Sequence, residues 1–291
     1  MKKTLSLIVR LALCLAWAGT ASAAGQDWQL LFTLQADQAT GPLRHPLGLF
    51  IDPVAERYYV ADSGRNRLVS FDKTGKLLHA FTAGGALDKP IALSKGVGGH
   101  LLVLEKGKGG LTEIDIKGRT VTPHPLADRG EALIPQRLQA NDDGLALIDQ
   151  ASGDLVVLDQ AFTVQRRLHC PDCPAGYADL AVKDGQIYAL PLLAEAIHHF
   201  DQTGNAPQTI PLNPAPAFPI ALALSPDGGF LVLERHGEVL HYQADGHLLA
   251  RHLGPGERPG SLAYPAAIQV DPWGRVCVVE EGNGRVSVFQ P

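Results

Sequence analysis

Two charged residues occupy a repeat position at which the rest of the chain has small side chains. Arg137 and Asp179 each lie two residues into one of six related segments. The same position in the other four segments is taken by Gly48, Ala92, Ala221 and Ala267. A confined charge is costly unless it is paired or solvated, and arginine binds carboxylates through two parallel hydrogen bonds. Arg137 and Asp179 are therefore either a structural ion pair or the start of a ligand-binding patch.

A cysteine pair lies in the loop between those two segments. Cys170 and Cys173 are separated by two residues, a spacing found in zinc sites, redox sites and local disulfides. Zinc would need two further ligands, and the chain has no second cysteine pair. In an oxidising compartment we expect a disulfide, with the remaining strand cysteine, Cys277, free and buried. His169 and Tyr177 flank the pair and complete the candidate binding patch.

Carboxylates end the second strand in five of the six segments. The residues at this position are Asp62, Glu105, Asp149, Pro191, Glu234 and Glu280. In the first and last segments an arginine follows, which gives the pairs Asp62–Arg67 and Glu280–Arg285. A ring of carboxylates could bind Ca²⁺, and the arginine pairs could contact a ligand. Because this position lies one strand away from the axis, we expect structural turn pairs instead.

The histidines do not indicate a metal site. The chain has 11, and they do not recur at one repeat position. A zinc enzyme would need about three converging on the axis. Neither a Gly-x-Ser-x-Gly elbow nor a phosphate-binding loop occurs. We therefore expect no catalytic residue, no metal and no cofactor.

The elements that position these residues are short strands. Residues 47–51, 58–61, 67–71 and 76–81 are rich in apolar, β-branched and aromatic side chains. Turn formers such as Asp52-Pro53 and Ser63-Gly64 separate them. This four-strand pattern recurs six times at intervals of about 45 residues, which is typical of propeller blades.

The two ends of the chain complete one another. The sixth segment stops at the end of its third strand, and residues 28–34 form a strand with no partner before it. Pairing the two would remove an open sheet edge. The sequence thus predicts an all-β fold, a six-bladed β-propeller with four-stranded blades, the last blade closed by the N-terminal strand.

Residues 60–77 resemble the NHL repeat, and residues 279–289 repeat the match. The other four segments keep the spacing but not the motif. The resemblance implies a six-bladed propeller that binds proteins or RNA. Similar six-bladed folds include metal-dependent lyases and lactonases.

The first 23 residues form a predicted signal peptide. Met1-Lys2-Lys3 is positively charged, residues 11–18 are apolar, and Ala21-Ser22-Ala23 is a small-residue cleavage site. The apolar run is too short for a membrane span, which needs about 20 residues. We expect residues 24–291 to be the propeller, exported to a bacterial periplasm or secreted.

The charge composition limits the classes of binding partner that the protein can have. The formal net charge of −5 and the absence of long basic runs argue against nucleic acid. The resulting hypothesis is an exported, monomeric, non-catalytic propeller that binds a protein or small ligand at the face carrying the inter-blade loops. The alternative is a metal-dependent hydrolase or lyase of similar fold, because fold alone does not fix function.

Overall fold

The computed structural model describes residues 28–291, except 97, 107, 142–143, 170–172, 174, 194 and 202–206. The predicted signal peptide, residues 1–23, lies outside the described residues. So does Cys170, one half of the expected disulfide. In the described part of the chain, no helix has the length and hydropathy needed to cross a bilayer.

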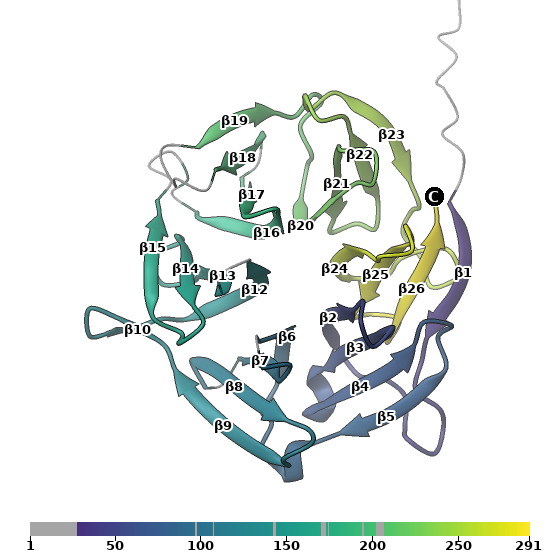
Figure 1. Cartoon of the computed structure of the whole chain (residues 1–291). Helices are drawn as coiled ribbons and strands as arrows, with labels where there is room; N and C mark the ends of the chain where they lie inside the picture. Colours follow the sequence, from purple (N-terminus) through teal and green to yellow (C-terminus); the bar gives the residue numbers. More distant parts are fainter. Residues whose placement is uncertain are drawn as a thin grey trace, which may run out of the picture.

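The described strands form six four-stranded antiparallel sheets set around a common axis, with the inner strand of each nearest the centre (Figure 1). Blade 1 contains β2 (Pro46–Asp52), β3 (Arg57–Asp62), β4 (Arg67–Asp72) and β5 (Leu77–Phe81). Blade 2 contains β6 (Pro90–Lys95), β7 (Leu101–Glu105), β8 (Gly110–Asp115) and β9 (Thr120–Pro125). Blade 3 contains β12 (Pro135–Asn141), β13 (Gly144–Asp149), β14 (Leu155–Asp159) and β15 (Val164–Leu168).

The second half of the ring repeats this order. Blade 4 contains β16 (Tyr177–Lys183), β17 (Gln186–Pro191), β18 (Ala196–Phe200) and β19 (Gln208–Pro211). Blade 5 contains β20 (Pro219–Leu224), β21 (Phe230–Glu234), β22 (Val239–Tyr242) and β23 (Leu248–His252). Blade 6 contains β24 (Pro265–Val270), β25 (Val276–Glu280), β26 (Arg285–Gln290) and β1 (Gln29–Leu34).

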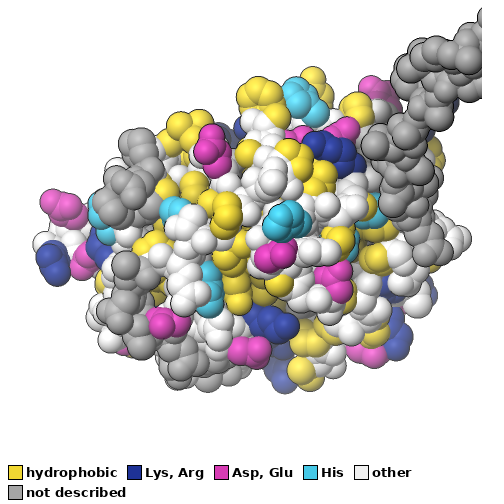
Figure 2. Space-filling model, turned by 90° about the horizontal axis from the view of Figure 1, so that it is seen from above, with side chains coloured by type: hydrophobic (Ala, Val, Ile, Leu, Met, Phe, Trp, Pro, Cys, Tyr) yellow, Lys and Arg dark blue, Asp and Glu magenta, His cyan; other side chains and the backbone are white. Residues whose placement is uncertain are grey.

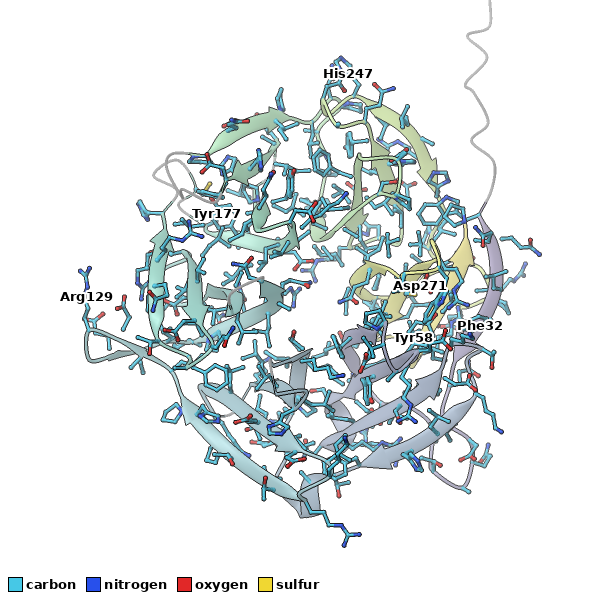
Figure 3. The ribbon with its side chains drawn as sticks, viewed as in Figure 1. Phe32, Tyr58, Arg129, Tyr177, His247 and Asp271 are labelled. Carbon is cyan, nitrogen blue, oxygen red and sulfur yellow. The ribbon has the colours of Figure 1, made fainter. Side chains whose placement is uncertain are left out.

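Three short elements lie outside the blades. They are the hairpin β10 (Ala127–Asp128) and β11 (Glu131–Ala132), and the 3₁₀ turns Ser63–Arg65 and Ala83–Gly85. The hairpin projects from the ring between blades 2 and 3, with Arg129 at its tip (Figure 3).

Aspartates set the hairpin turns between the third and fourth strands. Asp72 Oδ1 accepts hydrogen bonds from the N–H groups of Thr74 and Lys76, at 2.9 and 3.0 Å. Gly75 takes the left-handed conformation that such a turn needs, with φ of 88°. Asp159 accepts two equivalent bonds in blade 3. These local bonds explain why an aspartate follows the third strand in several repeats.

The hydrophobic core is divided among the junctions between neighbouring blades. The described residues form six buried apolar clusters, each built from the facing sides of adjacent blades. A blade therefore buries its two faces only when both neighbours are present. Seen edge-on, charged and histidine side chains are interspersed with apolar ones on the side in view (Figure 2).

The ring is closed by β1, as the sequence predicts. β1 pairs antiparallel with β26 over residues 29–34 and completes the sheet β1-β26-β25-β24. Leu34 is fully buried at the junction of blades 6 and 1. At the other end, Trp28 stacks on His252 of blade 5 with ring centroids 4.4 Å apart. The first strand thus contacts both neighbours of the last blade.

A buried polar cluster reinforces this closure (Figure 3). Asp271 of blade 6 accepts a hydrogen bond from Tyr58 of blade 1 at 2.7 Å and one from Arg275 Nε at 2.6 Å. The Arg275 guanidinium lies over the rings of Phe32 in β1 and Trp273, at 5.3 and 4.6 Å. Burial raises the pKa of the Tyr58 hydroxyl, so it stays a hydrogen-bond donor.

Deleting residues 28–34 should lower the melting temperature by about 10 °C or more, because it removes two buried side chains and leaves β26 as an open edge. The control is Leu31→Ser in the same strand, where the side chain is exposed; it should melt within about 2 °C of the parent. A deletion variant that melts with the control in a calorimetric scan would contradict this role of β1.

Candidate functional site

One face of the ring gathers the polar residues of interest. In each blade the inner strand starts beside the end of the second strand, as Pro46 beside Asp62 and Pro265 beside Glu280. The inter-blade loops lead into these inner strands, so loops and second-strand ends share one face. We call it the mouth face.

The five acids at the second-strand ends are buried and fasten the inter-blade loops. The N–H groups of Arg44, Asp88, Ile134, Ala217 and Ala263 bond Asp62, Glu105, Asp149, Glu234 and Glu280, respectively. Because these oxygens satisfy backbone donors inside the protein, they are not arranged as a ring of ligands for a cation.

The two arginine pairs have the same structural role. Arg67 Nε lies 2.6 Å from Asp62 Oδ2, and Arg285 Nε lies 2.8 Å from Glu280 Oε1. Both carboxylates are completely buried. Arg67 also donates to the carbonyl of Thr40 at 2.6 Å. Each arginine therefore joins a turn to a preceding loop, where removing one partner would leave a buried charge unpaired.

The innermost layer of the ring is crowded, and Arg137 and Asp179 occupy it together. A Cβ on Gly48 would lie 2.6 Å from the carbonyl oxygen of Ile91 in the next blade. In blades 3 and 4 the equivalent residues are charged, and Arg137 Nε lies 3.4 Å from Asp179 Oδ1. The pair joins β12 to β16 at the axis.

Asp179 is the more deeply buried partner. Its Oδ2 accepts a hydrogen bond of 2.9 Å from Leu222 N in β20, so one carboxylate of β16 contacts both neighbouring inner strands, β12 and β20. Burial raises the pKa of Asp179 above the usual carboxyl range, although Arg137 and the Leu222 N–H oppose the rise. The charge of Arg137, whose side chain is 30% exposed, is thus held at the axis.

A cavity of ≈ 320 Å³ opens at the mouth face among the starts of the inner strands. Its polar lining includes Lys106, Arg137, Gln150, Arg235 and Glu281. In the part of the chain that the structure describes, Lys106 and Arg235 have no carboxylate partner. The cavity therefore carries a local positive charge on a chain whose net charge is negative.

Four of these residues were missed by the sequence analysis. Lys106, Gln150, Arg235 and Glu281 each lie one residue beyond the end of a second strand. The preceding acid turns into the blade to fasten the loop, and the next side chain lines the mouth. A comparison of the six segments at the position directly after the second-strand acid would have found these four residues.

A histidine and a carboxylate face one another at the rim. His45 Nδ1 lies 3.0 Å from Glu281 Oε1, and the His45 side chain is 57% exposed. His45 immediately precedes the inner strand of blade 1 and has a φ of 50°. Tyr264 holds the equivalent place in blade 6 with a φ of 46°. Lys89 holds it in blade 2 with a φ of 47°, so this uncommon left-handed backbone recurs in the repeat and does not single out His45.

The structure separates the other two members of the predicted binding patch from Arg137 and Asp179. Tyr177 is fully buried between blades 3 and 4, with its hydroxyl 3.1 Å from His198 Nδ1. His169 lies away from the axis, with Nδ1 2.7 Å from Asp154 Oδ1. The mouth cavity includes Arg137 but neither Tyr177 nor His169.

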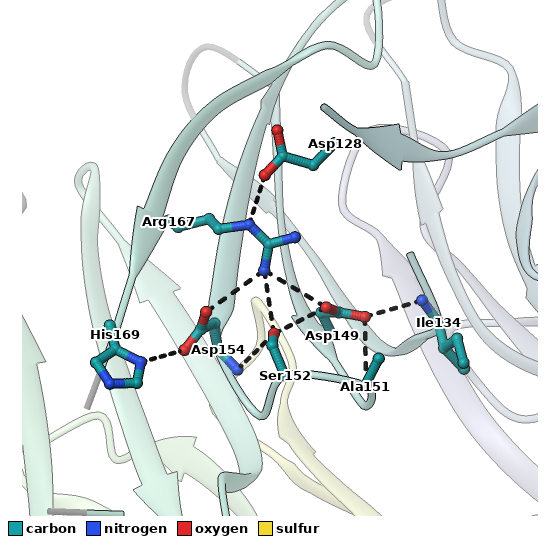
Figure 4. A network of polar contacts seen from close by, with 8 residues as sticks. All are labelled: Asp128, Ile134, Asp149, Ala151, Ser152, Asp154, Arg167 and His169. Atoms are coloured by element: carbon teal, nitrogen blue, oxygen red, sulfur yellow. Dashed lines mark hydrogen bonds and ion pairs between the residues drawn. The ribbon is translucent and has the colours of Figure 1, made fainter. Parts of the chain in front are cut away.

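His169 belongs to a polar network centred on Arg167 at the edge of blade 3 (Figure 4). Arg167 Nε lies 2.6 Å from Asp128 Oδ2 of the hairpin, and Nη1 lies 3.4 Å from Asp154 Oδ2. Arg167 Nη1 is also 3.5 Å from Asp149 Oδ2. Blade 3 thus obtains its arginine from the fourth strand, unlike blades 1 and 6, and uses it to anchor the β10–β11 hairpin.

The described side chains do not fit a resident metal. Among them, no group of three or more His, Cys, Asp or Glu residues is placed to hold an ion. The mouth cavity instead combines cations with Glu281, which pairs with His45 beside the cavity. We therefore derive no step through a metal.

No protein-family model and no curated protein matches the chain. Several solved structures match it over most of its length. A streptogramin B lyase has a TM-score of 0.66 at 14% identity, covering 91% of this chain and 98% of that one. A virginiamycin B lyase from Staphylococcus aureus has 0.61 at 13%, covering 91% and 89%. A gluconolactonase from Xanthomonas campestris has 0.65 at 16%, covering 88% and 87%. At these identities the likeness establishes the fold.

These comparisons correct the leading functional hypothesis. The sequence analysis preferred a non-catalytic binding protein to an enzyme. That preference is wrong, because the structural neighbours are named as enzymes, a lyase and a lactonase. They favour the enzyme alternative. Metal ligands that recur at a repeat position can be recognised in the sequence, whereas the cations of the mouth cavity and the His45–Glu281 pair come from different blades and meet only in the folded ring.

Asp179→Asn should stabilise the protein at neutral pH by an amount of the order of 1 kcal/mol. The raised pKa of Asp179 means that the folded state loses stability as pH rises from about 4, the unfolded value, through the folded value. The gain in the variant should vanish as pH falls toward 4, as measured by urea unfolding at several pH values.

Asp149→Asn provides a control of opposite sign. Burial opposes ionisation of Asp149, but the Ile134 N–H and the Ser152 hydroxyl hold its pKa below the ordinary value. This variant should lose about 1–3 kcal/mol at neutral pH, with the loss shrinking as pH falls. If both variants shift in the same direction at pH 7, the electrostatic account of Asp179 is wrong.

The thiols provide a further prediction. Cys277 is free and buried, and burial raises its pKa. If Cys170 and Cys173 are joined, alkylation under denaturing, non-reducing conditions should label one cysteine of residues 24–291, and mass spectrometry should place it at Cys277. Labelling of all three would reject the disulfide.

Proposed function

We propose that the protein is an enzyme, a hydrolase or a lyase, that acts on a small anionic substrate in the mouth cavity. One observation carries the proposal. The cavity sets Lys106, Arg137 and Arg235 around the same space that Glu281 lines beside His45. Cations that stabilise negative oxygen and a histidine–carboxylate pair that moves a proton are the parts that such chemistry requires. The enzyme structures of the same fold support the choice of class.

His45 is the proposed general base. Glu281 accepts the hydrogen bond from Nδ1–H, which fixes the ring and leaves Nε2 to take a proton. In a hydrolase the proton comes from a water that attacks an ester or lactone carbonyl. In a lyase it comes from the carbon beside a carboxylate or carbonyl. In both cases negative charge develops on a substrate oxygen.

Arg137 is the proposed contact for that oxygen. Its guanidinium reaches the cavity while Asp179 holds it from within the axis. Asp179, which is buried and does not line the cavity, is a positioning residue in this proposal. Tyr177 and His169, also predicted as binding residues, lie elsewhere and take no part in the chemistry proposed here.

Three finer features from the sequence also stay proposals. The NHL-type motif at residues 60–77 and 279–289 supports a relationship to that repeat family. The segment 1–23 supports export to the periplasm or the exterior, where a Cys170–Cys173 disulfide would form. A monomer is proposed because each blade already has two neighbours in the ring.

The test is turnover of a panel of small lactones and esters, each with and without a free carboxylate, by the purified protein. We expect activity on the carboxylate-bearing members. His45→Gln should lower kcat by about 10²–10⁴-fold, the usual contribution of a general base. The matched control is His247→Gln. His247 is an exposed histidine on the outer edge of blade 5 (Figure 3), with Nδ1 3.2 Å from Asp245 Oδ1, and it should keep full activity.

Two outcomes would refute the proposal. One is that no member of the panel is turned over. The other is that His45→Gln and His247→Gln have equal activity, which would remove the His45–Glu281 pair from the chemistry.

A further inference from the structure

The exposed apolar side chains gather on the mouth face. The structure describes nine large hydrophobic residues that are exposed, and five of them lie at the starts of inner strands or just after a second strand. They are Ile134, Leu192, Leu193, Phe218 and Tyr264. Leu193 and Phe218 are 80% and 58% exposed, and exposed apolar side chains that gather on one face mark binding surfaces more often than scattered ones do.

Three of these residues line one groove. A hollow of ≈ 360 Å³ runs between blades 4 and 5, with Leu192, Leu193, Pro216 and Phe218 along it. Ile220 and Arg235 belong both to this groove and to the mouth cavity. The two hollows therefore adjoin at a cation, and together they have the size of a small-molecule site.

The groove exists because blade 4 departs from the repeat. At the end of its second strand, Pro191 replaces the acid that fastens the inter-blade loop elsewhere. The loop after β17 instead projects Leu192 and Leu193 outward, held by a hydrogen bond from Leu192 N to the carbonyl of Gly176. Leucine is the blade 4 counterpart of Lys106, Gln150 and Arg235, so the ring of polar side chains is interrupted there.

The opposite wall is held in place. Tyr242, completely buried, donates a hydrogen bond of 2.8 Å to the carbonyl of Pro214. Glu234 accepts the N–H of Ala217 at 2.5 Å and that of Phe218 at 3.4 Å. Phe218 also packs edge-on against His236, with ring centroids 5.4 Å apart. A wall fixed in this way can bind an apolar group without first being ordered.

We propose that the ligand is an amphiphilic organic acid, with its carboxylate on Arg235 and Arg137 in the mouth cavity and its apolar chain in the groove between blades 4 and 5. This inference rests on the proposed function, since it names the class of substrate for the same site. The mouth cavity holds Arg235 and Arg137, whereas the groove is lined mainly by apolar side chains and also by one carboxylate, Glu195. The acid head is therefore drawn to the cations of the mouth cavity and the apolar chain to the groove.

The test measures binding without turnover. Acetate, butanoate, hexanoate and octanoate are titrated calorimetrically into the full chain below their micellar concentrations. Affinity should rise about two- to fourfold for each added methylene until the groove is filled, because each buried methylene contributes at most about 0.8 kcal/mol. Octanol, which lacks the charge, should bind at least tenfold more weakly than octanoate.

Variants separate the two ends of the ligand. Leu193→Ser should flatten the dependence on chain length, and Leu249→Ser, an exposed leucine on the outer strand β23, should leave it unchanged. Arg235→Leu should weaken all four acids by a similar factor. These are exposed positions, so the variants should fold normally.

The outcomes distinguish this inference from the proposed function. Equal affinity for all acids, or equal effects of Leu193→Ser and Leu249→Ser, would overturn the groove as a binding site even if the lactone panel is turned over. A chain-length dependence that Leu193→Ser alone removes would support the ligand class even if no member of the panel reacts.

Discussion

Closure of the ring by its first strand is the constraint on which the rest of the structure depends. The core is not a single cluster but six, one at each junction between blades. Each blade is stable only when both neighbours cover it, so an open ring would expose two apolar faces. β1 prevents this by pairing with β26, and Arg275 joins β1 to the first and last blades through Phe32 and Tyr58.

Closure also explains why charge can be held at the axis. Six inner strands converge there, and a Cβ at Gly48 would already collide with the neighbouring strand. Asp179 is stable in this layer because Arg137 and the N–H of Leu222 contact it from the two adjoining strands. Neither contact exists in an isolated blade. The same convergence places side chains from five blades around one small cavity, which local sequence could not position.

Positions that recur between blades stabilise the ring, whereas positions that differ between blades form the candidate site. The buried acids at the second-strand ends keep the loops fixed in five blades, and in four of these blades the residue after the acid lines the mouth cavity. Where Pro191 breaks the rule, the wall becomes apolar and a groove opens. The proposed chemistry and the proposed ligand class both come from positions that vary between blades, whereas the positions that recur hold the ring together.

The sequence by itself determined the fold, because strand periodicity, turn residues and a repeat of about 45 residues are local signals that all point to a propeller. It also identified Arg137 and Asp179, since a charge among small residues at one repeat position is visible without coordinates. It also grouped Tyr177 and His169 with them. In the structure the Tyr177 side chain lies in the junction of blades 3 and 4 and that of His169 contacts Asp154 at the edge of blade 3, because side chains close together along the chain can turn in different directions. The pairing of His45 with Glu281, 3.0 Å apart but at opposite ends of the chain, was decided only when the ring closed.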